Sequence, residues 1–317
     1  MYQAGEDVLE KKSITDLPNE ILLAIFSYLQ IYDIKHIIPN VCLQWANLST
    51  DAKLWKHLNF ETINKTTKTF GVRSWYSTLR FLETTPQLQN ITVSQGHSTD
   101  EIDEILTSLN NNNPSLHQIE FNVDISSIIK DLKKFSSILE NVESLKLKLN
   151  PAQSQTDVFK ALADFKNLKS VTFLEANPQH KDFDVFLNNC PLLENLNVAN
   201  DEFCKTNFLS LIKKKERFKS LFLKIDNLDE GCVKQLGTFP RLISLKIMDS
   251  NLTPEKLYEI GRLKCLKSLH LKEDASSPVL TASALTDFLH DGNFINLKEL
   301  KLHKSRLNNE GKTRIIL

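Results

Sequence analysis

The sequence predicts an α/β protein in which a short helical module precedes a solenoid of stacked strand-and-helix repeats. The first observation is a six-residue pattern of apolar residues that recurs nine times in phase. The second is an apolar helix within ITDLPNEILLAIFSYL (14–29), which lies outside this pattern. The third is size, because 317 residues with 41% hydrophobic content can bury a core in one large domain or two smaller ones.

The repeat has the form apolar-x-x-apolar-x-apolar, as in LENLNV (193–198). Successive copies begin 24 to 31 residues apart, and self-similarity at such a period is typical of a solenoid. A more divergent copy, WKHLNF (55–60), is expected to cap the array. The nine copies begin at Leu88, Leu116, Val142, Leu168, Leu193, Phe218, Leu242, Leu266 and Leu297.

Other features keep the same phase. In four copies a proline stands two residues before the first apolar position, where its fixed φ and missing N–H suit the turn into a strand. Between the strands, apolar residues at helical spacing predict helices, for example at 99–110, 155–165 and 281–290. Each unit is therefore one strand plus one helix, and only stacked neighbours can bury its apolar positions in a continuous core.

These repeats resemble leucine-rich repeats, and CPLLENLNV (190–198) is similar to the cysteine-containing, ribonuclease-inhibitor-like subtype. Most copies carry Asp or Asn where that subtype often has Cys. The resemblance covers roughly residues 55–307. It implies a solenoid with parallel strands on its concave face and helices on its convex face.

The N-terminal segment carries more apolar side chains than one buried face requires. Pro18 suits the first turn of a helix, and Glu20 is placed to favour the positive end of the helix dipole. A module of this size buries little surface by itself, and its surplus of apolar side chains therefore indicates a partner. The alternative is that the helices only cap the solenoid. One broad apolar face is predicted from Ile21, Leu22, Ile25, Phe26 and Leu29, with Leu17, Pro18, Leu23 and Tyr28 lying off it.

The residues after this helix extend the pattern, and together the following positions carry a resemblance: Leu17, Pro18, Glu20, Ile21, Ile25, Phe26, Leu29, Asp33, Ile34, Val41, Cys42, Trp45, Leu48 and Trp55. Through them residues 15–60 resemble an F-box, with Ile34 where leucine is more usual and an uncharged Leu43–Gln44 where basic residues are frequent. The resemblance implies three helices and a Skp-family adaptor as partner, which links to a cullin scaffold and its RING subunit. Contacts at or directly behind the adaptor interface are implied for Leu17, Pro18, Ile21, Leu22, Ile25 and Val41.

The two resemblances divide the chain into an N-terminal tail (1–13), an F-box (14–60) and a leucine-rich-repeat solenoid of about nine to ten repeats (61–317). They imply a non-catalytic substrate-recognition subunit of a Skp/cullin/F-box E3 ubiquitin ligase, which promotes ubiquitination and proteasomal degradation of a protein target. One alternative is an adaptor-binding scaffold without a role in ubiquitination. Another is a leucine-rich-repeat regulator of a GTPase or nuclease, which leaves the F-box unexplained.

Side chains two, four and six residues after the first apolar position of each repeat are expected to face out of the sheet. From residue 218 onward these positions carry several cations against one acid, Glu299. Such a surface suits an acidic or phosphorylated segment of another protein, although lysine is common on any open sheet, and Lys146 and Lys148 add charge on an earlier strand. The candidate target-binding residues are Phe222, Lys224, Lys246, Met248, His270, Lys272, Lys301 and His303.

Composition argues against several other classes of protein. Lys plus Arg and Asp plus Glu both total 39, so no overall excess favours nucleic acid as a partner. No apolar run is long enough for a bilayer or a secretory signal, so we expect an intracellular protein, in the cytoplasm and/or nucleus, without membrane contact. The five scattered cysteines are expected to be reduced, buried thiols. The sequence has no local catalytic motif or metal-ligand spacing, so we expect neither enzymatic activity nor a cofactor.

Overall fold

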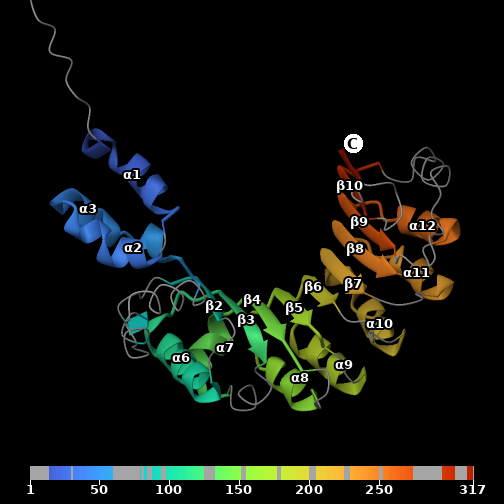
Figure 1. Ribbon diagram of the computed structural model, residues 1–317. Helices are drawn as coiled ribbons and strands as arrows, with labels where there is room; N and C mark the ends of the chain where they lie inside the picture. Colours follow the sequence, from blue (N-terminus) through green and yellow to red (C-terminus); the bar gives the residue numbers. More distant parts are fainter. Residues whose placement is uncertain are drawn as a thin grey trace, which may run out of the picture.

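The computed structural model describes residues 14–29, 31–59, 79, 82–83, 88–93, 98–124, 133–150, 155–176, 180–199, 205–224, 229–249, 253–273, 295–303 and 313–316. Within these residues a small helical module is followed by a curved sheet with helices on one side. Figure 1 shows an arc in which the strands line the inner face and the helices cover the outer face. The module stands at one end of this arc and the last strands at the other.

The N-terminal module consists of short helices around a small core of its own. Pro18 lies at the N-cap of α1 rather than in its first turn, and its carbonyl oxygen accepts hydrogen bonds from the backbone N–H groups of Ile21 and Leu22 at 3.0 and 3.1 Å. The core comprises Leu22, Phe26, Ile34, Ile38 and Leu54. The elements are η1 (Ile14–Asp16), α1 (Asn19–Phe26), α2 (Ile31–His36), η2 (Ile38–Asn40), α3 (Leu43–Ser49) and η3 (Ala52–Trp55).

The sheet contains one strand for each predicted repeat, and the strands follow one another in sequence order. Strands β1 to β10 pair in parallel, each with the next. Strand β1 comes from the divergent copy near Trp55, so the sheet begins inside the range expected for the F-box. The strands are β1 (His57–Asn59), β2 (Asn90–Val93), β3 (Gln118–Asp124), β4 (Ser144–Lys148), β5 (Ser170–Leu174), β6 (Asn195–Ala199), β7 (Ser220–Lys224), β8 (Ser244–Asp249), β9 (Ser268–Glu273), β10 (Glu299–His303) and β11 (Thr313–Ile316).

Strand β11 departs from the expected all-parallel sheet. It pairs antiparallel with β10, with Lys301 opposite Arg314 in the register. Only residues 304–312 connect the two strands. A parallel pairing needs a crossover of a dozen or more residues, so this connection is short enough that the chain must reverse direction.

Capping side chains mark the starts of three helices of the solenoid, α6, α11 and α12. Ser98 and Glu101 form a reciprocal capping box at the start of α6, and the side chains of Asp229 and Thr253 cap α11 and α12. The helix predicted at 99–110 is confirmed, that at 155–165 is shorter than predicted, and 281–290 lies outside the described residues. The helices are α6 (Thr99–Asn112), α7 (Ser136–Asn141), α8 (Thr156–Leu162), α9 (His180–Asn189), α10 (Lys205–Ile212), η5 (Lys215–Arg217), α11 (Glu230–Leu236) and α12 (Pro254–Gly261).

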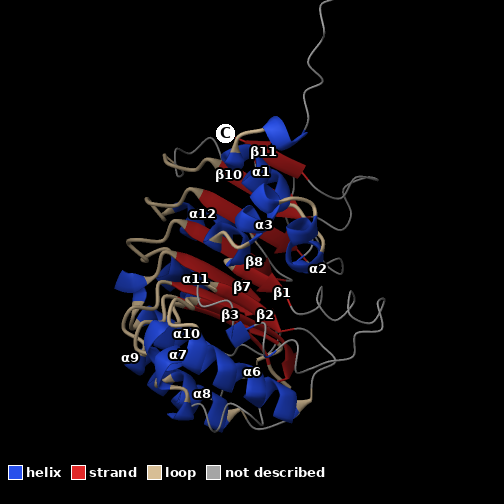
Figure 2. Cartoon of the chain, turned by 90° about the vertical axis from the view of Figure 1, so that its left-hand side faces the viewer, coloured by secondary structure: helices blue, strands red, loops and turns tan. Residues whose placement is uncertain are grey.

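The apolar positions of the repeat form the core of the solenoid. All three apolar positions of all nine copies are buried, which confirms the prediction of a continuous core shared by stacked neighbours. In Figure 2 the strands stack side by side with the helices packed along one side of them. The core is aromatic in its middle, where the ring of Phe159 lies 5.2 Å from that of Phe173 and 6.0 Å from that of Phe186.

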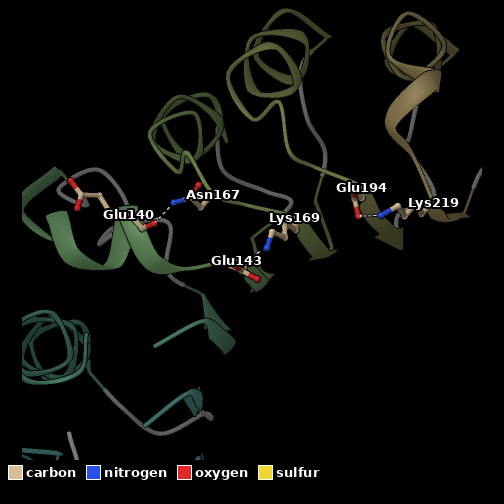
Figure 3. A network of polar contacts seen from close by, with 6 residues as sticks. All are labelled: Glu140, Glu143, Asn167, Lys169, Glu194 and Lys219. Atoms are coloured by element: carbon tan, nitrogen blue, oxygen red, sulfur yellow. Dashed lines mark hydrogen bonds and ion pairs between the residues drawn. The ribbon is translucent and has the colours of Figure 1, made fainter. Parts of the chain in front are cut away.

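The entry to each strand is held by a repeated backbone contact. One carbonyl oxygen in the turn before each strand accepts two N–H groups from the next repeat, as Glu143 does from Lys169 and Ser170 at 2.8 and 2.9 Å. In one such turn the Asn167 side-chain amide also donates to the Glu140 carbonyl oxygen at 2.6 Å (Figure 3). These contacts satisfy backbone groups at the sheet's edge and keep equivalent residues of successive turns aligned.

Trp55 joins the module to the solenoid. Its indole N–H donates to the Ser49 carbonyl oxygen at 2.8 Å, and its ring packs against both hydrophobic cores.

The described cysteines are all free thiols. Cys190 and Cys232 are buried and Cys42 is half-buried. Cys265 is exposed, so the prediction of burial is wrong for this residue. In the part of the chain that the structure describes, no helix has the length and apolar character that a membrane span requires.

Candidate functional site

The apolar surface of α1 divides between the inside and the outside of the module. Leu22 and Phe26 are buried, and the Phe26 ring meets Trp45 edge-on at 5.0 Å. Ile21 and Ile25 instead remain 48% and 38% exposed. The predicted apolar face of this helix is therefore divided, because the core of the module covers only part of the stripe.

The six predicted adaptor-contacting residues fall into two groups. Pro18, Ile21, Ile25 and Val41 lie on the surface. Leu22 is fully buried, so it could act only by supporting the surface from behind, whereas Leu17 is half-buried and packs against the core.

Two helix starts lie together at this surface. The Gln44 side-chain amide on α3 donates to Asn19 Oδ1 on α1 at 3.0 Å, so the beginning of α3 lies beside the beginning of α1. Val41 and Leu43, just before and at the start of α3, are exposed near this contact in the sequence. Tyr28 and Leu29 of the predicted apolar helix are also exposed. The further large apolar residues that are exposed in the module are Ile14, Tyr28, Leu29, Ile37 and Leu43.

The predicted target-binding residues lie in two rows across the inner face of β7 to β10. The register pairs Phe222 with Lys246 and Lys246 with His270 in one row, and Lys224 with Met248 and Met248 with Lys272 in the other. Lys301 continues the first row next to His270. His303 pairs with Lys272 in the register, but its side chain is outside the described residues.

The centre of this face is a lysine stacked on an aromatic ring. Lys246 Nζ lies 4.0 Å from the centroid of the Phe222 ring, a cation–π arrangement. Burial lowers the pKa of Lys246 below its ordinary value, and the charges of Lys272 and Lys301 lower it further. These like charges make the site favourable for an anion, because an anion would relieve their repulsion.

Glu299 reduces the positive charge at the β10 end of the face. Its carboxylate accepts hydrogen bonds from Lys301 and from Ser268, and it lies 3.3 Å from His270 Nε2. Hydrogen bonds from Lys301, His270 and Ser268 hold the pKa of this carboxyl at about 2. Lys301 and His270 are therefore engaged, and the cations of this face that form no ion pair with a described residue include Lys246 and Lys272.

The two lysines of the earlier strands are also engaged. Lys146 pairs with Glu120 on the neighbouring strand, and Lys148 lies 3.5 Å from the Glu175 carboxylate. Their charge does not extend the cationic face towards the N-terminus. The described residues contain no cluster of three or more His, Cys, Asp or Glu that could hold a metal ion.

Comparisons with known proteins agree with this two-part organisation. Residues 14–61 match the F-box-like family model. Over 61 residues, 18% of this chain, the sequence is 39% identical to F-box/LRR-repeat protein 5 of Salmo salar, and the match spans only 9% of the salmon protein's length.

Two solved structures are similar to parts of this chain. One is the leucine-rich repeat-containing protein LegL7 from Legionella pneumophila, with 17% identity, a TM-score of 0.43, and coverage of 72% of this chain and 85% of that one. Another is TLR13 in its complex with ssRNA13, with 17% identity, a TM-score of 0.40, and coverage of 61% and 30%. Both scores are low, so the assignment of the solenoid rests on the nine in-phase copies and the strand order. The chain thus combines an F-box-like segment with a leucine-rich-repeat solenoid.

Proposed function

We propose that this protein is a non-catalytic substrate-recognition subunit of a Skp/cullin/F-box E3 ubiquitin ligase. Its F-box binds a Skp-family adaptor, and its solenoid binds a protein target. The observation that carries the proposal is the F-box-like segment, which has its own small core and still leaves Ile21, Ile25 and Val41 exposed. Exposed apolar residues on short helices favour a partner.

The same observation argues against a module that only caps the solenoid. A capping helix packs its apolar face on the last repeat and turns a polar face to water. Here the contact with the solenoid core runs through Trp55, while α1 keeps apolar residues on its outer side. The outer apolar side therefore requires another explanation, and an adaptor surface supplies one.

The mechanism that follows is one of proximity. The adaptor connects the F-box to the cullin and RING subunits, and the solenoid holds the target beside them, which raises the effective concentration of target lysines near the charged ubiquitin-conjugating enzyme. The protein itself needs no reacting group for this. An acidic or phosphorylated target segment suits the inner face at Phe222, Lys246, Met248 and Lys272, where cations surround an apolar spot.

Co-expression of the full chain with a Skp-type adaptor tests the proposal. In the variant Ile21→Ser with Ile25→Ser, both outward-facing apolar anchors are replaced, and we expect the one-to-one complex on size exclusion to weaken by about tenfold to a hundredfold in Kd. The matched control is Val185→Ser with Leu209→Ser, which changes two exposed apolar residues on α9 and α10 and should leave the complex intact.

Failure of the unaltered chain to form the complex would overturn the adaptor role. Equal loss in the variant and the control would show that the exposed face of α1 is not the interface. If the complex forms, a reconstituted ligase separates a receptor from a scaffold: a receptor supports ubiquitination of its bound target, and a scaffold does not.

A further inference from the structure

The turns that lead into strands β7 to β10 are strongly basic. These turns are the residues between each preceding helix and the strand, together with the last residues before β10, and we call them the basic edge (213–219, 237–243, 262–267 and 295–298). They hold ten Lys or Arg residues and one acid, Glu216. The basic residues are Lys213, Lys214, Lys215, Arg217, Lys219, Arg241, Arg262, Lys264, Lys267 and Lys298.

The equivalent turns of the earlier repeats have no such excess. The turns before β3 to β6 (113–117, 142–143, 163–169 and 190–194) contain two lysines and three acids. Two of these acids take part in ion pairs between turns, shown in Figure 3: Lys169 with Glu143 and Lys219 with Glu194, both at 2.7 Å. Positive charge therefore accumulates on one end of one edge of a chain whose total charge is zero.

Few cations of the basic edge form an ion pair with an acid among the described residues. Lys219 pairs with Glu194, and Arg262 pairs with Glu259 at 3.0 Å. Arg217 is held inside its turn, where it donates to the Cys190 carbonyl oxygen at 3.0 Å and lies over the Phe218 ring. Among the described residues no acid forms an ion pair with the other seven: Lys213, Lys214, Lys215, Arg241, Lys264, Lys267 and Lys298.

The backbone aligns the last residues of the four turns in a row. The Lys219 carbonyl oxygen accepts from Ile243 N–H, the Ile243 carbonyl from Lys267 N–H, and the Lys267 carbonyl from Lys298 N–H, each at 2.8 Å. Neighbouring strands lie about 4.8 Å apart, so the row from β7 to β10 extends about 14 Å. An extended peptide of about four or five residues spans that length.

The apolar residues on the edge indicate the kind of anion that it fits. Ile243 is 37% exposed within the row and Ile295 is 86% exposed in the last turn. The aromatic residues of these turns, Phe218 and Phe239, are buried, so the basic edge presents no ring on which a base could stack. Single-stranded nucleic acid is usually held by such rings, whereas aliphatic residues between cations fit a polypeptide that alternates acids with aliphatic side chains.

We propose that the basic edge binds an acidic segment of a partner protein that also carries aliphatic residues. This surface is separate from the inner-face site at Phe222 and Lys246, and its binding does not depend on the F-box. The partner's carboxylates would pair with cations such as Arg241, Lys264, Lys267 and Lys298, and its aliphatic side chains would cover Ile243 and Ile295.

The test uses the full chain and a fluorescein-labelled synthetic peptide of repeated Glu-Ile-Glu, with fluorescence anisotropy as the measurement. The variant combines Arg241→Glu, Lys264→Glu and Lys298→Glu, which are all exposed. We expect it to bind the peptide at least about tenfold more weakly. The control combines Lys160→Glu, Lys181→Glu and Lys234→Glu, which are exposed on α8, α9 and α11 and change the net charge equally; it should bind like the unaltered chain.

Three results would overturn the proposal. The first is no binding of the peptide, or equal binding of a Gln-Ile-Gln version. The second is an equal loss of peptide binding in the variant and the control, which would show that binding depends only on the net charge of the protein. The third is tighter binding of an oligothymidylate or of phosphatidylserine vesicles with the same sensitivity to the variant, which would assign the edge to nucleic acid or to a membrane. The variant should still bind the Skp-type adaptor, so a loss of peptide binding can be distinguished from a failure of the adaptor role.

Discussion

The N-terminal module and the solenoid use apolar side chains in opposite ways. In the solenoid, every apolar position of the nine repeat copies is buried, because each repeat covers its neighbour. In the module, α1 buries Leu22 and Phe26 but leaves Ile21 and Ile25 on the surface. The module has no second copy to cover its outer side. Stacking therefore covers the apolar positions of the repeats, whereas the module keeps Ile21 and Ile25 on its surface.

The largest expected effect comes from the aromatic centre of the solenoid. Phe159→Ala removes a fully buried ring that packs against Phe173, Phe183 and Phe186, and we expect the free energy of unfolding to fall by about 3–5 kcal/mol. Urea unfolding followed by circular dichroism measures this change. Val185→Ala, at an exposed position on the neighbouring helix, should cost less than about 0.5 kcal/mol. A loss below about 1 kcal/mol for Phe159→Ala would contradict a sealed core.

The second prediction compares two residues on the same helix of the module. Leu22→Ala should destabilise the module by about 2–4 kcal/mol, because Leu22 is buried in its core. Ile25→Ala should change the stability by less than about 0.5 kcal/mol, because its side chain is on the surface. Thermal unfolding of the full chain, followed by the fluorescence of the tryptophans that include Trp45 in this core, measures both. Equal effects would mean that α1 has no separate inner and outer apolar sides.

The smallest expected effect concerns thiols. Burial raises the pKa of Cys190 from its ordinary 9.0 to about 12, although the charges of Arg217 and Lys166 partly oppose this rise. At pH 8 iodoacetamide should therefore modify Cys265 first, Cys42 of the module more slowly and Cys190 only after unfolding, as mass spectrometry can show.

The same shift has a consequence for stability at high pH. The folded chain holds the Cys190 proton more tightly than the unfolded chain does, so this contribution is complete below pH 9 and is lost as the pH rises towards 12. Cys190→Ser should therefore reduce the loss of folding stability between pH 9 and pH 12. Rapid modification of Cys190 in the folded chain at pH 8 would contradict its burial.

Much of the fold could be predicted from the repeat pattern alone. A strand with one buried face must alternate, and a helix between two strands must turn an apolar side towards them, so the six-residue pattern predicted strands β2 to β10 and helix α6. Strand β11 escaped prediction, because its four residues carry no copy of the pattern and its place depends on how the chain returns to β10. The exposure of Cys265 was missed for a similar reason, because it depends on the turn in which the residue lies.

Only the tertiary structure shows which residues of the two candidate surfaces are exposed and which are covered or paired. Sequence placed Lys146 and Lys148 on a strand, but their partners Glu120 and Glu175 lie 26 and 27 residues away along the chain, and only stacking brings each pair together. Sequence likewise put Ile21, Leu22, Ile25 and Phe26 on one helical stripe. Packing of α1 against α3 and Trp45 decided which of them are covered.

By itself, the sequence determined the solenoid of strand-and-helix repeats, the helical module before it and the alternation of buried and outward strand positions, because these follow from local periodicity and the hydrophobic effect. The tertiary structure decided which lysines pair with an acid among the described residues, which apolar residues of α1 stay exposed, and that the turns before β7 to β10 lie side by side along one edge. These properties depend on distances between residues that stacking alone brings together, and neither the charge count nor the periodicity of a single chain contains those distances.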